Sequence, residues 1–261
     1  MNHSITKKII TGITATALLL AAGIPAAMAE EEVPSADASV AFLSKYVWRG
    51  FELSKDSLVI QPSLSVSYMG FGANLWANLD TDVYGTDTYN WNETDFTLSY
   101  DGSFEKLGYG VGWIYYALEG VDEILSLTEA TEVSDTQEFY GTLSYDILLA
   151  PSLTIYYDTD AFAGAWYANL GFGHSFTIAE NYSLDLGLAF GYLDDNEGYA
   201  ELHDGLVSAS MSFPVGKYVS ITPELYYSFA LTSDAEDYIK DPGLSDKADF
   251  FYGGISASFS F

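Results

Sequence analysis

The chain of 261 residues contains no cysteine, so a disulfide scaffold, thiolate metal sites and cysteine nucleophiles are all excluded. Basic residues are scarce: nine lysines and arginines stand against 37 aspartates and glutamates, a formal net charge of −28. Such a surface repels nucleic acids and anionic lipid headgroups, so we expect no nucleic-acid partner. After Ile24 no apolar run approaches about 20 residues, and the sequence therefore predicts no transmembrane helix.

The first 29 residues have the features of a secretory signal peptide. The basic pair Lys7-Lys8 is followed by apolar or small residues from 9 to 24, and Ala27-Met28-Ala29 is a small-residue cleavage site. We expect cleavage after Ala29. Losing two lysines and no acid takes the formal charge from −28 to −30.

Alternation of apolar and polar residues dominates the rest of the chain, which is 16% aromatic and contains 23 glycines. In "SLDLGLAFGY", residues 183–192, large apolar side chains fall on one face and small or polar ones on the other. A strand of about ten residues with this period of two is typical of a transmembrane β-barrel. A soluble sandwich shows the same period with its apolar face inward. The number of strands and the loop lengths must therefore distinguish a membrane barrel from a soluble sandwich.

Twelve segments follow the pattern, and the sequence therefore predicts an all-β fold, a transmembrane antiparallel up-and-down barrel formed as one domain by residues 38–261. Residues 30–37 are expected to be a short periplasmic lead. The predicted strands are residues 38–50, 57–69, 71–81, 93–101, 107–119, 137–148, 153–160, 164–176, 183–193, 205–214, 218–231 and 249–261.

The connections mostly alternate between short turns, such as Met69-Gly70, and longer acidic loops, such as residues 120–136, although the links at residues 51–56 and 159–163 are short. This asymmetry is typical of bacterial outer-membrane barrels, with both termini in the periplasm. The C-terminal Phe261 resembles the aromatic signal by which the outer-membrane assembly machinery recognises its clients. We therefore expect outer-membrane lipid, lipopolysaccharide and that machinery as partners.

The segment from Leu43 to Asp80 carries a family resemblance. "YVWRG" (Tyr46–Gly50), "QPSL" (Gln61–Leu64) and the Gly-Phe hairpin from Gly70 to Asn78 resemble the N-terminal hallmark of the TorF-like porin family, also called the Gcw_chp domain. The resemblance implies an outer-membrane channel, and it supplies no catalytic residues.

The phase of the alternation assigns side chains to the lumen. If Val40, Phe42, Tyr46 and Trp48 face lipid, the cations on the same predicted strand point inward, since a cation facing the bilayer midplane costs about 2–4 kcal/mol. The predicted pore-lining residues are Lys45, Arg49, Asp80, Asp95, Glu138, Asp146, Asp158, Asp185, Glu224 and Tyr226. Two interpretations of the cations stay open: they orient dipolar solutes in a constriction, or they only neutralise neighbouring carboxylates.

These observations predict a passive diffusion channel for small solutes, preferring cations or neutral molecules because luminal acids outnumber cations. The alternative is a closed barrel that scaffolds a periplasmic or surface partner. An enzyme such as an outer-membrane phospholipase would need a serine–histidine pair. His174 has only phenylalanines as same-face neighbours, and His203 lies in a predicted acidic loop. We expect no catalytic site, metal or cofactor.

Overall fold

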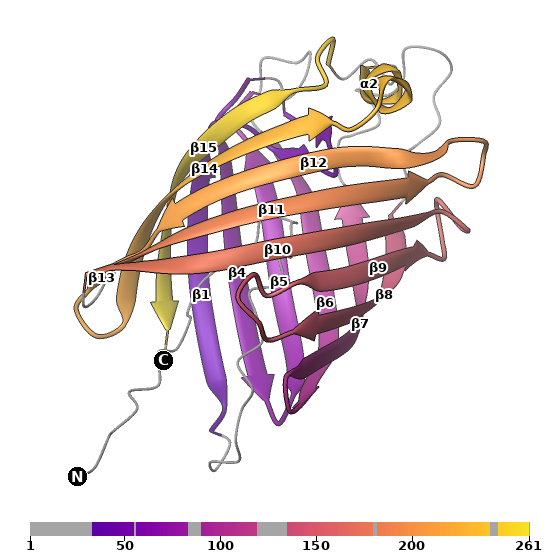
Figure 1. Cartoon of the computed structure of the whole chain (residues 1–261). Helices are drawn as coiled ribbons and strands as arrows, with labels where there is room; N and C mark the ends of the chain where they lie inside the picture. The colour runs from indigo at the N-terminus through magenta and orange to yellow at the C-terminus, as the bar shows by residue number, and fades with distance from the viewer. Residues whose placement is uncertain are drawn as a thin grey trace.

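The computed structural model describes residues 33–54, 56–82, 90–118, 135–179, 182–240 and 245–260. In this part of the chain, twelve long strands form one antiparallel sheet that closes on itself (Figure 1). They are β1 (Ser35–Leu43), β4 (Val59–Tyr68), β5 (Phe71–Asp80), β6 (Asn90–Phe104), β7 (Leu107–Leu118), β8 (Thr136–Tyr145), β9 (Ser152–Asp158), β10 (Trp166–Ala179), β11 (Tyr182–Asp194), β12 (Ala200–Met211), β14 (Val219–Ala230) and β15 (Phe250–Ser260). The predicted twelve-stranded antiparallel barrel is confirmed.

Closure comes from the pairing of the first and last strands. β1 pairs with β4 on one side and with β15 on the other, and β12 pairs with β14. The three-residue β13 (Phe213–Val215) pairs with β14 at its end. A closed sheet leaves no edge, so the backbone groups of the wall find partners without water, as a membrane requires.

The exposed side chains show which face of the barrel is apolar. In β11, Leu186 and Leu188 are 43% and 36% exposed, whereas Ala189 on the opposite face is 1% exposed. The same arrangement recurs along the other strands, with apolar residues outward and polar residues inward. It is the reverse of a soluble sandwich and is the arrangement of a barrel that crosses lipid.

The two ends of the barrel differ. β1 begins and β15 ends at the same end, where Asp37 is opposite Ser260. Tight turns such as Met69-Gly70, with φ angles of 53° and 82°, also lie there. We call this the terminal end. The opposite loop end carries the helix α2 (Ser233–Lys240), which lies over the barrel mouth (Figure 1). No helix in the described residues is long and apolar enough to cross a membrane.

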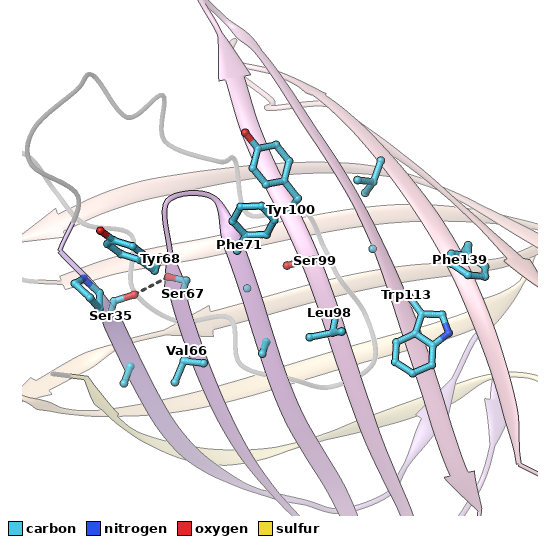
Figure 2. A pocket seen from close by; sticks show the side chains of 16 residues that line it. Ser35, Val66, Ser67, Tyr68, Phe71, Leu98, Ser99, Tyr100, Trp113 and Phe139 are labelled. Carbon is cyan, nitrogen blue, oxygen red and sulfur yellow. Dashed lines mark hydrogen bonds between the residues drawn. The ribbon is translucent and has the colours of Figure 1, made fainter.

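A shallow apolar groove lies on the outer wall near the terminal end. It measures 1070 Å³ and crosses β1 and β4–β8. Its lining includes the small Ala36 and Ala73, and Figure 2 shows among the lining side chains the rings of Phe71 and Tyr100, which are 4.9 Å apart. The exposed aromatic rings at this depth match the interfacial aromatic girdle of membrane barrels.

The prediction of the first strand, residues 38–50, is wrong at its C-terminal boundary. β1 stops at Leu43, and the following residues leave the wall and turn into the barrel. Tyr46, which was expected to face lipid, is 1% exposed inside the barrel, and Trp48 is also turned inward. Val40 and Phe42 do lie on the outer face. The predicted signal peptide and Phe261 lie outside the described residues.

Candidate functional site

A short hairpin occupies the lumen at the loop end. Its two strands, β2 (Val47–Trp48) and β3 (Phe51–Glu52), form a separate two-stranded sheet. Arg49 and Gly50 make the turn between them, with φ angles of 47° and 84°. Positive φ at both positions is the requirement of a type I′ hairpin turn, and glycine adopts it without steric cost. Residues 44–54 are called the luminal hairpin below.

Inward side chains from well-separated wall strands surround the luminal hairpin. The ring of Tyr46 lies 5.6 Å from that of Trp76 on β5, and the ring of Phe51 lies 5.1 Å from that of His203 on β12. Val47 is 1% exposed. Contacts with opposite sides of the wall place the hairpin inside the barrel, where it narrows the lumen.

Arg49 is the most extensively bound residue of the hairpin. Its Nη1 and Nη2 donate to Oε1 and Oε2 of Glu138 on β8, at 2.8 and 2.7 Å. Its guanidinium carbon lies 4.3, 4.8 and 4.5 Å from the rings of Trp48, Tyr156 and Tyr167. A bidentate carboxylate and stacked aromatic rings are the two environments that a planar guanidinium favours.

Lys45 is held at the base of the hairpin. Its Nζ lies 2.6 Å from Glu52 Oε1 and 2.5 Å from Asp56 Oδ1. Burial lowers the pKa of Lys45, but the ion pairs with Asp56 and Glu52 outweigh burial and leave the pKa above its ordinary value. Both predicted cations therefore lie in the lumen as ions, but on an inward hairpin instead of the first strand.

A β-bulge aims two polar residues of β12 at the hairpin. Phe190 is opposite Gly205 and Tyr192 is opposite Leu202, so His203 and Asp204 together face the single residue between them. Both side chains are buried, at 0% and 3% exposure. Bulges of this kind re-aim side chains next to functional sites.

His203 fastens the hairpin turn to the wall. Its Nε2 lies 3.0 Å from the carbonyl oxygen of Arg49, and its Nδ1 lies 2.7 Å from Tyr199 Oη. Because a carbonyl only accepts, Nε2 carries the proton and donates, and Nδ1 accepts from the tyrosine hydroxyl. Both ring nitrogens are therefore used.

The helix α2 closes over the same region. The rings of Tyr199 and Tyr238 stack at 3.9 Å, and Tyr238 Oη donates to Asp195 Oδ2 at 3.0 Å. Burial alone would raise the pKa of Asp195. The hydrogen bonds from the backbone amides of Glu197 and Tyr199 and from the Tyr238 hydroxyl lower it by more, so the net pKa is below the ordinary value. The helix is thus attached to the loop between β11 and β12.

A second bulge lies across the lumen, in β6. Asn78 is opposite Glu93 and Leu79 is opposite Trp91, so Asn92 is the extra residue and points inward beside Glu93. Gln61 donates to Asn78 at 3.0 Å, and Asn78 donates to Asn92 at 2.7 Å, which forms a row of amides across three strands. Asp95 Oδ1 has no hydrogen-bond partner among the described residues.

The structure places most of the other predicted pore-lining acids inside. Asp80 accepts from Ser57 Oγ at 2.5 Å, and Asp158 accepts from Thr136 Oγ1 at 2.6 Å. Asp185 faces the lumen at the terminal end and is partly exposed. Their role in a pore stays a prediction, because the contacts fix their position and not their effect on a solute.

Glu224, Tyr226 and Asp146 complete the predicted set. Tyr226 Oη donates to Glu224 Oε2 at 2.8 Å, and both residues are buried inside. Asp146 was wrongly assigned to the lumen: β8 ends at Tyr145, and Asp146 lies in the exposed turn that follows, with its amide bonded to the Lys106 carbonyl. The alternation had been extended past the end of the strand.

The terminal half of the lumen has a different lining from the loop half. Its inward residues are small and polar, and they are partly exposed; they include Ser65, Asn74, Thr97, Ser99, Thr142, Ser210 and Ser258. The loop half is filled by the hairpin and by large side chains such as Trp76, Tyr156 and Tyr252. The lumen is therefore open to solvent at the terminal end and narrow at the loop end.

Glu93, Asn92 and Asp204 also lie in the lumen, although the alternation did not predict them there. Each lies in or beside a pair of adjacent polar residues, Asn92-Glu93 or His203-Asp204, that interrupts the alternation. Two neighbouring polar residues within a strand of period two are the available signal for a bulge.

The comparisons with known proteins give a family and a fold. A family model described as "Bacterial protein of unknown function (Gcw_chp)" matches residues 29–162. The solved NanC porin has 12% identity to this chain over 86% of this chain and 98% of its own, with a TM-score of 0.50. The COG4313 outer membrane channel from Pseudomonas putida F1 has 10% identity over 88% and 96%, also with a TM-score of 0.50. No curated protein sequence matches the chain.

Proposed function

Because the chain belongs to the Gcw_chp family of bacterial proteins and has the fold of an outer-membrane barrel, we propose that it is a porin-like channel for small solutes, narrowed by the luminal hairpin. The observation that carries this proposal is the polar, ion-paired lumen. A wall that encloses Lys45, Arg49 and Glu138 with rows of serine and asparagine provides the groups that line aqueous pores. The TorF-like porin label remains the resemblance drawn from the sequence.

The proposed channel prefers cations and neutral solutes. Lys45 and Arg49 are already paired, with Glu52, Asp56 and Glu138. Several inward acids form no ion pair with any lysine or arginine in the described residues: Asp80, Glu93, Asp95, Asp158 and Glu224. Their summed field favours cations in the narrow half of the lumen.

The proposed location is the bacterial outer membrane, with the terminal end in the periplasm and the loop end outside. Lipid and lipopolysaccharide would then contact the apolar wall, and the C-terminal strand would be recognised by the outer-membrane assembly machinery. The short turns at the terminal end support this orientation, because outer-membrane barrels have their short turns on the periplasmic side.

A catalytic role is not part of the proposal. Nδ1 of His174 lies 2.8 Å from the carbonyl oxygen of Leu148, on the outer side of the barrel. His203 uses both ring nitrogens on Arg49 and Tyr199. Within the described residues neither histidine therefore contacts a serine hydroxyl, which nucleophilic acyl transfer would require.

The second candidate is a closed barrel that scaffolds a partner. The burial of the hairpin favours it: Tyr46 and Tyr252 are each 1% exposed, and Tyr226 and Tyr252 stack at 5.0 Å inside the lumen. A lumen filled in this way at one end would conduct only if the hairpin leaves a path beside it.

Single-channel recording decides between the two candidates. The mature protein is refolded, inserted into a planar bilayer and recorded under a KCl gradient. Discrete current steps with a cation-selective reversal potential support the channel. Silence from protein that is shown to be folded, by its β-sheet circular dichroism, supports the scaffold instead.

A further inference from the structure

The wall residues that surround the Arg49 guanidinium form a binding site without any contribution from the hairpin. Glu138 presents both carboxylate oxygens, and Tyr116 Oη donates to Oε2 at 2.8 Å and fixes the carboxylate. The rings of Tyr156 and Tyr167 flank the position of the guanidinium. These side chains come from four adjacent strands, β7–β10, so the site exists without the hairpin.

A second carboxylate adds to the negative charge of this region. Asp204, re-aimed by the bulge in β12, accepts from Tyr167 Oη at 2.9 Å. It is 3% exposed and forms no ion pair with any described lysine or arginine. Removing the Arg49 cation would therefore leave Glu138 buried and uncompensated in a region where Tyr167 also holds Asp204, which is costly enough to favour a replacement cation.

The group that fills the site is carried by a separate element. The luminal hairpin forms its own two-stranded sheet and, in the part of the chain that the structure describes, pairs with no strand of the wall. At its turn, Arg49 is fixed to the wall through its side chain to Glu138 and through its carbonyl oxygen to His203. The guanidinium is thus held as a bound ligand is held, by two hydrogen bonds and aromatic faces.

We propose that Glu138, Tyr156 and Tyr167 form a guanidinium-binding site, filled by Arg49 in this structure, and that the guanidinium group of a solute can take the place of Arg49. This deepens the proposed channel function and rests on it. The solute class is small guanidinium-bearing cations. A planar guanidinium matches the fork of the carboxylate and stacks on tyrosine, whereas a compact ammonium forms neither arrangement as well.

Binding is tested first, independently of conduction. The Arg49→Ala variant is purified in detergent, and its thermal unfolding is measured with 10 mM methylguanidinium or 10 mM methylammonium. We expect methylguanidinium to raise the midpoint by about 2–4 °C, methylammonium to have less effect, and the Arg49→Ala/Glu138→Gln double variant to show no difference. A folded Arg49→Ala barrel that responds equally to both cations overturns the site.

Exchange with Arg49 is then tested in wild-type channels. Methylguanidinium should reduce the single-channel current at concentrations at which methylammonium does not, and Glu138→Gln should remove the difference. Arg49→Lys serves as the second variant, because it keeps the charge that Glu138 needs but loses the bidentate contact. Channels of this variant should be blocked at a several-fold lower concentration of methylguanidinium than wild-type channels. Conducting wild-type channels that show no selective block overturn exchange. A barrel that binds but never conducts overturns the channel function and leaves the binding result standing.

Discussion

Replacing Arg49 by methionine removes the cation of the buried pair while keeping most of the side-chain volume. Glu138 would then stay buried in the lumen, still accepting from the Tyr116 hydroxyl but without an ion-pair partner among the described lysines and arginines. The two side chains of the pair are 9% and 5% exposed, so water compensates little of the lost charge interaction.

The expected cost follows from this burial. Removing one partner of a buried ion pair destabilises a protein by about 3–5 kcal/mol, since the remaining charge is uncompensated. Adding Glu138→Gln should recover most of that loss, because glutamine is neutral and its oxygen still accepts from Tyr116. The matched control is Lys240→Met, which breaks the exposed i,i+4 pair with Glu236 and should cost far less than the loss of the buried pair.

The assay is urea unfolding of the four proteins refolded into lipid vesicles, followed by tryptophan fluorescence. Trp48 and Trp76 lie in the lumen beside or within the hairpin and report on its environment. An Arg49→Met variant within about 1 kcal/mol of wild type, with no recovery in the double variant, would show that the pair contributes no more than a surface ion pair and would refute the reasoning.

Three further predictions concern the hairpin, the helix and the lumen. Gly50→Ala should destabilise the barrel by about 1–3 kcal/mol in the same urea assay, because its Cβ would lie 3.0 Å from Asp204 Cβ at a φ of 84°; an unchanged midpoint would show that the turn is not constrained. Asp195 has a lowered pKa, so its contact with Tyr238 stabilises above the ordinary aspartate value of about 3.9 and is lost as the pH falls through the folded-state pKa. The stability difference between wild type and Asp195→Ala should therefore be present at pH 6 and shrink below pH of about 4, and a difference that grows in acid would contradict the sign. Asp95→Asn removes an inward acid that forms no ion pair with any described lysine or arginine, so in the proposed cation-preferring channel it should move the reversal potential under a KCl gradient toward zero; no change would mean that permeating ions do not pass near it.

The barrel could be predicted from the sequence because lipid imposes a strict pattern on every strand. An inward residue meets water or other polar groups and an outward residue meets acyl chains, so a period of two is repeated twelve times along the chain. The segment 183–193 shows this pattern and corresponds to β11, Tyr182–Asp194. Local alternation was sufficient there because the environment of each residue depends only on its side of the wall.

The luminal hairpin could not be predicted from the same pattern. Tyr46 and Trp48 alternate with Lys45 and Arg49 in a hairpin as they would in a wall strand, so the period does not distinguish the two. What turns the chain inward is a set of distant contacts, chiefly the pairing of Arg49 with Glu138, 89 residues away. The Arg49-Gly50 pair is not one of the strong local signals for a two-residue hairpin, which are Asn-Gly, Asp-Gly and Gly-Gly.

The residues at the two bulges could not be predicted for a related reason. A strict period of two assigns Asn92 and Glu93 to opposite faces, whereas the extra residue in β6 turns both inward. The same holds for His203 and Asp204 in β12. One inserted residue changes the phase of the strand beyond it, so a pattern read from either end misplaces the residues at the junction.

The division of the lumen into two unlike halves has an electrical consequence. The terminal half is accessible to solvent and would behave as an extension of the bathing solution, while the loop half is filled by protein. A voltage applied across the bilayer would therefore fall mainly over the loop half, and the electric field would be strongest around the hairpin. Moving a full elementary charge through that field is worth about 2.3 kcal/mol at 100 mV. In the proposed channel, the ion pair of Arg49 with Glu138 would therefore lie where the electric field is strongest.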